Sequence, residues 1–520
     1  MRRRATLENL GVLVLGLLVL VVHDVGYVIN QPYWTDEDWV ALTTKFPLSQ
    51  LLATTNSTPV GFSVLIRFFT VSGTQSARVV PLAFAGAAVV VAYWFARRLD
   101  WPRVEASLCA GLLAGVGMLM VPAMLIRDDL KQYTTDAFFV VLVLAVLSRL
   151  EREWSKGNSS RRMLALLSVV TWGGMLFSDA VAFMGAAAFT GVCLVPLARR
   201  DWRKLRDALI AGVATAALIL VVYKAFDAQA VTPSLTFSPH FGGYYPPLHS
   251  GKRAFLSFLY QHALTVETHF GLGPLWLGAA AFVLGVVTVL RRGRPATAIA
   301  LAILWPEMVI LAALRLYPFL DPRTSTFLFA VTAVVAAIGV AGLCSLLWPF
   351  LKRVLAIGLA MAAVAGFVVA ALPSVRSHGI PFESMKAVTL YVADHAPAHS
   401  VVVLAQDSNF GFAYYWPKGG EPSREPDNTI IQGYEAYYPD QPNIVVALSR
   451  TPAGVDTAMN QALAQSRARG CTPIWLIRTH TKVVEWDAYQ AWIKQHDATG
   501  SRPDGSSDLV VLQIPKSQCR

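Results

Sequence analysis

The segment from Arg127 to Arg152 reads RDDLKQYTTDAFFVVLVLAVLSRLER, a charged stretch followed by a long apolar run and a basic end. An α-helix needs roughly 20 apolar residues to cross the hydrocarbon core of a bilayer. Asp128, Asp129 and Asp136 lie before the run, whereas Arg149 and Arg152 lie at its far end with the single acid Glu151 between them. The segment therefore predicts a membrane-spanning helix near residues 131–150 with different chemistry at its two ends.

Similar apolar runs recur along the first 372 residues. Of the 520 residues, 55% are hydrophobic and only 15% are charged, and the mean hydropathy is +0.48. Soluble domains are closer to about 25% charged, and the modest Gly, Pro and Cys contents exclude collagen-like, disordered and disulfide-rich classes. We predict a polytopic α-helical membrane protein with eleven spans, near residues 8–29, 76–98, 104–123, 131–150, 162–178, 180–198, 207–226, 272–290, 296–316, 324–348 and 352–372.

The basic residues lie in short clusters between these runs, which explains the net charge of +11 without a nucleic-acid partner. If Arg2 to Arg4 are cytoplasmic, the predicted inner loops hold about twice as many Lys and Arg residues as the outer loops before residue 324. The first run is long for a signal peptide and lacks a cleavage site, so we expect an uncleaved anchor. The usage of Arg, Ala and Val is typical of a GC-rich bacterium. We therefore expect a multi-pass protein of the bacterial cytoplasmic membrane with a cytoplasmic N-terminus.

The composition changes after Pro373, which gives two predicted domains, 1–373 and 374–520. The first has long outer loops at 30–75 and 227–271, and residues 35–46 and 60–71 are predicted to form helices along the membrane surface. The second alternates helical stretches with short apolar β-type runs at Val401 to Leu404, Ile474 to Ile477 and Leu509 to Ile514, which predicts an extracytoplasmic α/β domain. Its two cysteines, Cys471 and Cys519, could form a disulfide in an oxidising compartment, or remain two thiols.

Three consecutive carboxylates, Asp36, Glu37 and Asp38, follow the first apolar run. Placing charged side chains at a bilayer surface costs free energy unless water solvates them or they take part in function. One interpretation is helix capping, with Thr35 as the N-cap and Asp38 as its N3 partner. Another is catalysis, in which a carboxylate accepts a proton from an attacking hydroxyl. The two interpretations are compatible, because a cap fixes the direction of a neighbouring carboxylate.

Two further polar clusters fall on the same predicted outer face. One comprises Arg127, Asp128, Asp129, Lys131, Tyr133 and Asp136, and the other comprises Tyr317, Asp321 and Arg323. A solvated loop and a Pro-rich turn near lipid headgroups would explain them without any function. Acids surrounded by Arg, Lys and Tyr at this surface also fit a lipid-linked phosphate, since cations neutralise a phosphate leaving group.

Several short motifs occur in an order that resembles the GT-C glycosyltransferases. They are Trp34-Thr35-Asp36-Glu37, Pro47 to Leu52, Pro59-Val60-Gly61-Phe62, Ala77 to Leu82, Leu130 to Ala137, Phe177 to Ala180, and Tyr317-Pro318 with Arg323. The sequence is most similar to the bacterial branch that includes protein O-mannosyltransferases, lipid A aminoarabinose transferases and rhizobial galacturonosyltransferases. The likeness covers residues 8–350, with Thr58-Pro59-Val60-Gly61 where the family has Pro-Pro-x-Gly or Pro-Pro-x-Tyr.

The resemblance implies a fold, a reaction and a set of site residues. Such enzymes transfer a sugar from a polyprenyl-phosphate donor to an envelope glycan, lipid or protein acceptor on the outer face of the membrane, usually with inversion. Asp36 would be the general base, and Glu37 would orient it or bind sugar. Lys131, Arg323 and Arg127 would bind the donor phosphate, and Asp128, Asp129, Tyr133, Tyr317 and His249 would line the substrate site.

The branch generally uses no metal, so no cofactor is expected. The Asp36-Glu37-Asp38 spacing leaves a divalent ion possible, with further ligands from distant loops. A transporter or flippase is the alternative function, but it should place ionisable or broken segments mid-membrane in two matching halves. A membrane-anchored sensor would need neither eleven spans nor clustered acids. Arabinofuranose, mannose, galactose and an aminosugar all fit as the transferred sugar.

Overall fold

The computed structural model describes residues 2–23, 25–49, 58–70, 76–121, 130–158, 160–227, 241–270, 275–347, 385–423, 435–503 and 505–519, with residues 358, 362, 365 and 369. The chain forms two compact units. The first comprises residues 1–28, 58–62 and 78–379, and the second comprises 29–57, 63–77 and 380–520. Each has its own apolar core.

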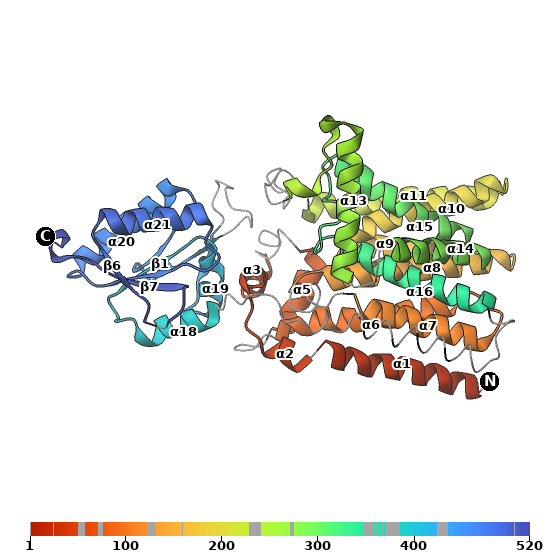
Figure 1. The fold of residues 1–520 in the computed structure, drawn as a ribbon, viewed down its shortest axis with the longest axis horizontal. Helices are drawn as coiled ribbons and strands as arrows, with labels where there is room; N and C mark the ends of the chain where they lie inside the picture. Colours follow the sequence, from red (N-terminus) through yellow and green to blue (C-terminus); the bar gives the residue numbers. More distant parts are fainter. Residues whose placement is uncertain are drawn as a thin grey trace. The chain divides into compact units, whose positions relative to one another are not determined.

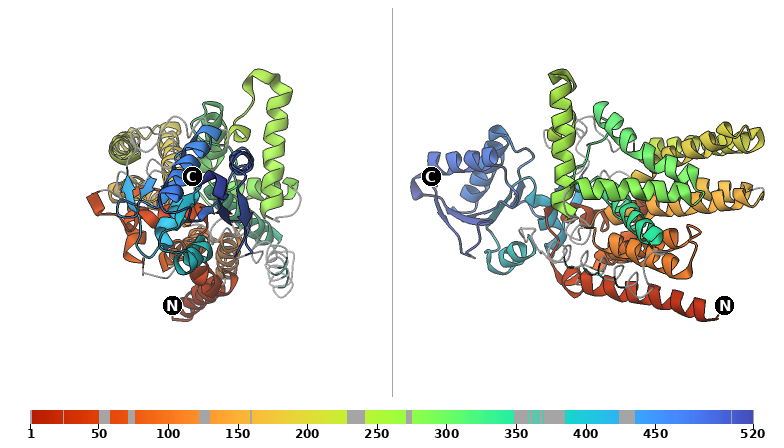
Figure 2. Two further views of the ribbon diagram at one scale, coloured as in Figure 1. Left: turned by 90° about the vertical axis from the view of Figure 1, so that its left-hand side faces the viewer. Right: turned by 45° about the vertical axis from the view of Figure 1, so that its right-hand side comes forward.

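The first unit is helical (Figures 1 and 2). Its longer helices are α1 (Arg2–Val22), α6 (Val79–Arg97), α7 (Val104–Leu119), α8 (Tyr133–Ser155), α9 (Arg161–Gly174), α10 (Ala180–Ala198), α11 (Trp202–Val222), α13 (Gly251–Phe270), α14 (Leu275–Arg291), α15 (Pro295–Ala313) and α16 (Thr326–Leu347). The short α2 (Val25–Asn30) and α5 (Val60–Phe68) each lie where the chain passes between the units.

Among the residues that the structure describes, six helical segments are long and apolar enough to cross a membrane: Ser76–Arg97, Tyr133–Ser155, Ala180–Ala198, Trp202–Phe226, Pro295–Ala313 and Thr326–Leu346. Each coincides with a predicted span. Three more predicted spans contain shorter apolar helices, at Leu10–Leu20, Val104–Leu119 and Trp276–Arg291. The span predicted at 162–178 contains the 14-residue α9, and the one predicted at 352–372 lies almost wholly outside the described residues. The polytopic helical class is confirmed, whereas the count of eleven stays a prediction.

Small residues allow the core helices to pack closely. A Cβ added at Gly285 of α14 would lie 2.0 Å from the backbone oxygen of Val335 in α16, and one at Gly339 of α16 would lie 2.1 Å from that of Ala281. Only glycine fits such contacts, which are typical of helix interfaces in membranes. The α14–α16 pair is therefore fixed at two points.

The region 227–271, predicted as a long outer loop, contains the 20-residue helix α13. It runs across the direction of the other long helices of this unit (Figures 1 and 2). Phe258 and His262 on α13 pack against Phe319, with ring centroids 6.0 and 6.2 Å apart. The helix thus covers the segment that joins α15 to α16.

The second unit contains a five-stranded sheet in the order β4-β1-β5-β7-β6. Strands β4 (Ile444–Val446), β1 (Val401–Leu404) and β5 (Ile474–Ile477) are parallel, and β7 (Leu509–Gln513) and β6 (Thr499–Ser501) complete the sheet antiparallel. The helices are α18 (Met385–His395), α19 (Ser408–Tyr415), α20 (Pro452–Ala468) and α21 (Val483–Gln495), and β2 (Glu421–Ser423) pairs with β3 (Glu435–Tyr437). The α/β character of this region is as predicted. Cys471 and Cys519 form a disulfide with a Cα–Cα distance of 5.8 Å.

The acidic segment after the first apolar run belongs to this second unit. Its helix α3 (Thr35–Thr43) packs on α19. Residues 35–46 and 60–71 were both predicted to be helical, and α3 and α5 occupy them. The contact with α19 means that the C-terminal region holds the segment that carries Asp36.

Candidate functional site

Helix α3 is capped one residue earlier than the sequence predicts. Trp34 is the N-cap, and its backbone N–H donates to Oε2 of Glu37 at 3.2 Å. The assignment of Thr35 as N-cap and Asp38 as its partner is therefore wrong. The indole of Trp34 has no hydrogen-bond acceptor for the free N–H groups of the first turn, and Glu37 makes the side-chain contact that closes this turn. Asp36 consequently occupies N2.

The three acids of α3 differ in exposure. Glu37 and Asp38 are completely buried, while Asp36 retains partial exposure. Both buried carboxylates lie in the first turn, where the helix dipole favours negative charge. Of the three, Asp36 is the acid that solvent or a substrate can reach.

Two tyrosines of α19 hold the segment that leads into α3. The backbone N–H of Tyr33 donates to the hydroxyl of Tyr415 at 2.9 Å, and the rings of Tyr33 and Tyr414 meet edge to face at 5.5 Å. At the other end of α3, Lys45 Nζ lies 4.2 Å from the centre of the Tyr414 ring and donates to the backbone oxygen of Tyr414. Burial raises the pKa of Tyr414 to about 12, and the nearby Asp38 carboxylate acts in the same direction. Tyr414 therefore stays neutral beside the acids.

In the first unit, residues from two predicted clusters come together at the start of α8. Lys131 and Tyr133 are buried, with 5% and 7% exposure. The guanidinium carbon of Arg323, from the α15–α16 connection, lies 5.9 Å from the centre of the Tyr133 ring. Such a cation–π arrangement keeps a guanidinium beside an aromatic wall without cancelling its charge.

The phenol of Tyr317 lies among three carboxylates. Its hydroxyl donates to the backbone oxygen of Thr324 at 2.7 Å. Burial raises its pKa well above the usual value, and the charges of Asp136, Asp179 and Asp321 raise it further. These carboxylates come from α8, the α9–α10 connection and the α15–α16 connection. The fold thus gathers three separate segments around one phenol.

Asp179 was not among the predicted site residues, although the Phe177-Ser178-Asp179-Ala180 motif contains it. Burial raises its pKa to about 6. Nearby, the Thr135 hydroxyl lies 2.6 Å from the backbone oxygen of Phe177, so the α9–α10 connection is tied to the start of α8. In the sequence, Asp179 is a single acid between two apolar runs, and this pattern could have identified it as a candidate site residue.

Tyr244 is a second residue that the sequence reasoning missed. The backbone N–H of Phe319 donates to its backbone oxygen at 2.9 Å, and its ring lies 5.6 Å from that of His262. Burial and the Asp321 carboxylate raise its pKa. His249, predicted to bind substrate, is exposed on the short turn Leu248–Ser250 that precedes α13.

Arg127, Asp128 and Asp129, also predicted as site residues, lie outside the described residues. Among the residues that the structure describes, no group of three or more His, Cys, Asp and Glu side chains could hold a metal ion. The start of α8 thus has Lys131 and Tyr133 with Arg323 nearby, and the carboxylates of Asp136, Asp179 and Asp321 surround Tyr317.

No family model matches the sequence, and no curated protein matches it. Solved structures do. ArnT from Cupriavidus metallidurans, bound to undecaprenyl phosphate, superimposes with a TM-score of 0.53 at 13% identity over 98% of both chains. The archaeal oligosaccharyltransferase AglB from Archaeoglobus fulgidus, in complex with an inhibitory peptide and a dolichol-phosphate, gives 0.53 at 12% identity over 98% of this chain and 74% of its own. Both are members of the GT-C superfamily.

The chain has the GT-C fold. The resemblance drawn from the short motifs is thereby confirmed at the level of the fold. At an identity of 12–13% the similarity supports a shared fold only, so the reaction has to be inferred from the site residues. The Archaeoglobus enzyme has also been solved with Zn and sulfate, a structure that gives a TM-score of 0.51 at 12% identity over 90% of this chain and 68% of its own.

Proposed function

We propose that the protein is a membrane glycosyltransferase that transfers a sugar from a polyprenyl-phosphate donor to an envelope glycan, lipid or protein acceptor. The observation that carries the proposal is the match to Cupriavidus ArnT over 98% of both chains, in a structure solved with undecaprenyl phosphate. The fold and the ligand class of this neighbour agree with the motif order in the sequence.

In this proposal the donor phosphate binds at the start of α8. Arg323 supplies a guanidinium that can form two parallel hydrogen bonds to phosphate oxygens, and Lys131 supplies a second positive charge. The Tyr133 ring beside Arg323, at 5.9 Å, limits how far the guanidinium can turn. Arg127 would add a third cation. Neutralising the phosphate as it leaves is the electrostatic contribution that such a reaction needs.

Asp36 acts as the general base that deprotonates the acceptor hydroxyl. Its partial exposure, beside the completely buried Glu37 and Asp38, supports this role. Glu37 caps the helix through the Trp34 backbone N–H, which fixes the first turn and therefore the direction of Asp36. The attack would proceed with inversion at the sugar carbon, as the resemblance implies.

We also propose that the N-terminus is cytoplasmic and that residues 380–520 lie outside the cytoplasmic membrane of a bacterium. The distribution of basic residues between the predicted loops supports this orientation. Both polar clusters then lie at the outer surface, where lipid-linked sugars present their headgroups.

The test is donor turnover by the purified protein in nanodiscs. Polyprenyl-phosphate donors carrying arabinofuranose, mannose, galactose or an aminosugar are supplied in turn, and release of the free polyprenyl phosphate is followed by mass spectrometry. Turnover of one of them is expected. Movement of intact donor across the bilayer with no release would instead support the transporter alternative.

Arg323→Ala and Lys131→Ala test the phosphate site. Each change removes a charge-assisted contact worth about 1.5–3 kcal/mol, so donor binding should weaken roughly 10- to 100-fold. Arg253→Ala is the matched control, because Arg253 is an exposed cation on α13 of the same unit. Equal binding by the wild type and both site variants would show that these cations only meet lipid headgroups.

A further inference from the structure

A cavity of about 420 Å³ lies between α6 and α8, far from the cluster of site residues at the start of α8. Its wall on α8 runs from Ala145 to Lys156, just past the end of that helix. Helix α8 has 23 residues, which at 1.5 Å for each residue separates its two ends by roughly 33 Å. The cavity is therefore a separate feature at the opposite end of the bundle.

The lining of this cavity is strongly basic. Four cations, Arg98, Arg149, Arg152 and Lys156, face a single carboxylate, that of Glu153. Glu153 already accepts from Lys156 at 3.0 Å and from the side-chain amide of Asn158 at 2.7 Å. The positive charge of the lining thus exceeds its negative charge by three.

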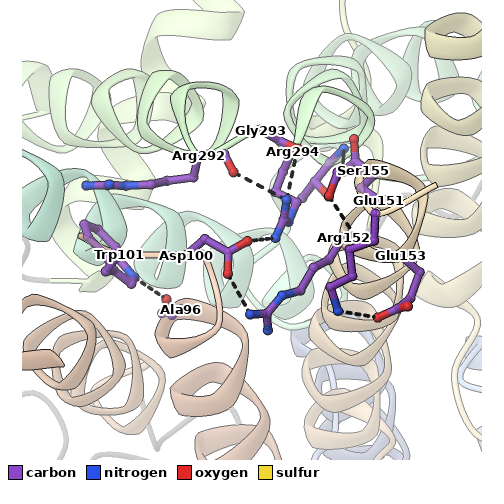
Figure 3. A network of polar contacts seen from close by, with 12 residues as sticks. Ala96, Asp100, Trp101, Glu151, Arg152, Glu153, Ser155, Arg292, Gly293 and Arg294 are labelled. Atoms are coloured by element: carbon purple, nitrogen blue, oxygen red, sulfur yellow. Dashed lines mark hydrogen bonds and ion pairs between the residues drawn. The ribbon is translucent and has the colours of Figure 1, made fainter. Parts of the chain in front are cut away.

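A polar network behind the cavity holds Arg152 in place (Figure 3). Asp100, in the α6–α7 turn, contacts Arg152 at 3.0 Å and also contacts Arg294, which is 2% exposed. Glu151 accepts from the hydroxyl and the backbone N–H of Thr297 at 2.7 and 3.0 Å. These contacts join α6, α8 and α15 at this end. Asp100 shares its single negative charge between Arg152 and Arg294, so the lining stays strongly positive.

The polarity of the cavity changes along α8. Arg152 and Lys156 lie near or beyond the end of the helix, whereas Ala145 lies about 15 Å inside that end, by the rise of the helix. On α6, Trp94 and Phe95 lie one turn inside Arg98, whose guanidinium is 4.7 Å from the Trp94 ring. A charged mouth and an apolar interior fit a molecule with an anionic head and a hydrocarbon tail.

We propose that this cavity binds an anionic phospholipid, with its phosphate between Arg98 and Arg149 and its glycerol and upper acyl chain against Trp94 and Ala145. Basic pockets between membrane helices bind such headgroups by charge and by shape. Bound lipid would connect α6 and α8, the two helices that line the cavity, and so stabilise the bundle that also positions Lys131 and Tyr133 at the other end of α8.

The test is native mass spectrometry of the detergent-purified protein titrated with phosphatidylglycerol. The wild type should bind one lipid molecule saturably and melt at a higher temperature when it is bound. Arg98→Gln with Arg149→Gln should weaken binding by about tenfold for each lost charge-assisted contact. Ala145→Phe, which keeps every charge and fills the interior, should also weaken it.

Arg162→Gln with Arg199→Gln is the control, because both residues are exposed cations at the same end of the bundle and outside the cavity lining. An equal loss in this control would overturn the proposal in favour of general attraction to anionic membranes. Glycerol 1-phosphate competing as strongly as the lipid would overturn it in favour of a soluble phosphate ligand. If phosphatidylcholine bound as tightly as phosphatidylglycerol, the cavity would not select for an anionic headgroup, and the proposal would be overturned.

Discussion

Gly411 of α19 lies against Asp38 of α3, so closely that a Cβ added at Gly411 would be 2.3 Å from Oδ2 of Asp38. Real side chains do not tolerate such a separation, so the glycine is required for the two helices to pack. Both residues belong to the second unit, and Tyr33, Tyr414 and Tyr415 make further contacts around them. The C-terminal region therefore shapes the segment that carries the proposed base.

We predict that Gly411→Ala displaces α3 and lowers sugar transfer at least tenfold while the protein remains folded. The added methyl group must move both the Asp38 carboxylate and the Met385 side chain, at a cost of about 1–3 kcal/mol. Turnover and melting temperature are measured together. Asp38→Ala in the same protein removes one of the two clashes, so the double variant should regain only part of the stability that Gly411→Ala loses.

Gly243→Ala serves as the control, because nothing lies within 4 Å of the position of its Cβ. If Gly411→Ala and Gly243→Ala both turn over donor at the wild-type rate, α19 has no influence on the reaction.

Asp179 gives a prediction about pH. Burial raises its pKa to about 6 from an ordinary value of 3.8, so the folded protein binds a proton more tightly than the unfolded chain does. Stability should therefore rise as the pH falls through 6 toward 4, and fall as the pH rises through 6. Melting temperatures in detergent at pH 5 and pH 7.5 should differ by roughly a few degrees in the wild type. Asp179→Asn removes one titrating carboxyl and should reduce the difference; an unchanged pH profile would contradict the shift.

The elements predicted most accurately are those with a continuous apolar pattern. Val401–Leu404 and Ile474–Ile477 were predicted as strands with the bounds that β1 and β5 have. They are fully buried β-branched or apolar runs at the centre of the sheet, which sequence patterns identify well. The strand β6 (Thr499–Ser501) was missed because it is an exposed, polar edge strand.

The features that could not be predicted from the sequence depend on tertiary contacts. Helix α13 was missed because the Pro- and Gly-rich residues before it dominate the composition of its region, and because Phe258 and His262 pack against another segment. The cap of α3 was displaced because Glu37, rather than a hydroxyl at N-cap, makes the contact. The contacts that hold α3 and its flanking residues on α19 join distant parts of the chain: Lys45 and Tyr414 are 369 positions apart, and Tyr33 and Tyr415 are 382 apart.

The disulfide between Cys471 and Cys519 tests the orientation of the chain. The two residues are 48 positions apart, and closing a loop of that length stabilises a fold by about 4 kcal/mol in the chain-entropy model. We predict that the bond is oxidised in intact cells and that a membrane-impermeant maleimide labels it only after reduction. Cys471→Ser with Cys519→Ser should lower the melting temperature of the second unit. Free thiols that only a membrane-permeant reagent can label would place the C-terminus in the cytoplasm.

The last prediction separates catalysis from capping at Asp36. Asn keeps the size of the side chain but cannot accept a proton near neutral pH. At N2 of α3, loss of the charge should cost no more than about 0.3–1 kcal/mol of helix–dipole energy, so expression and melting temperature should change little. Loss of a general base should lower turnover roughly 10²- to 10⁴-fold. The measurement is release of polyprenyl phosphate by wild-type and Asp36→Asn protein in nanodiscs.

Two neighbouring variants give the comparison that makes this result specific. Glu37→Gln retains an oxygen that can accept from the Trp34 backbone N–H, so α3 should keep its first turn and turnover should fall less than in Asp36→Asn. Asp38→Asn should be milder again if this buried residue only packs against α19. If Asp36→Asn turns over donor normally while Asp128→Asn or Asp129→Asn is inactive, the base belongs to the segment before α8. Normal turnover by all of these variants would overturn the assignment of the base to either segment and leave the carboxylates around Tyr317, those of Asp136, Asp179 and Asp321, as the candidates to vary next.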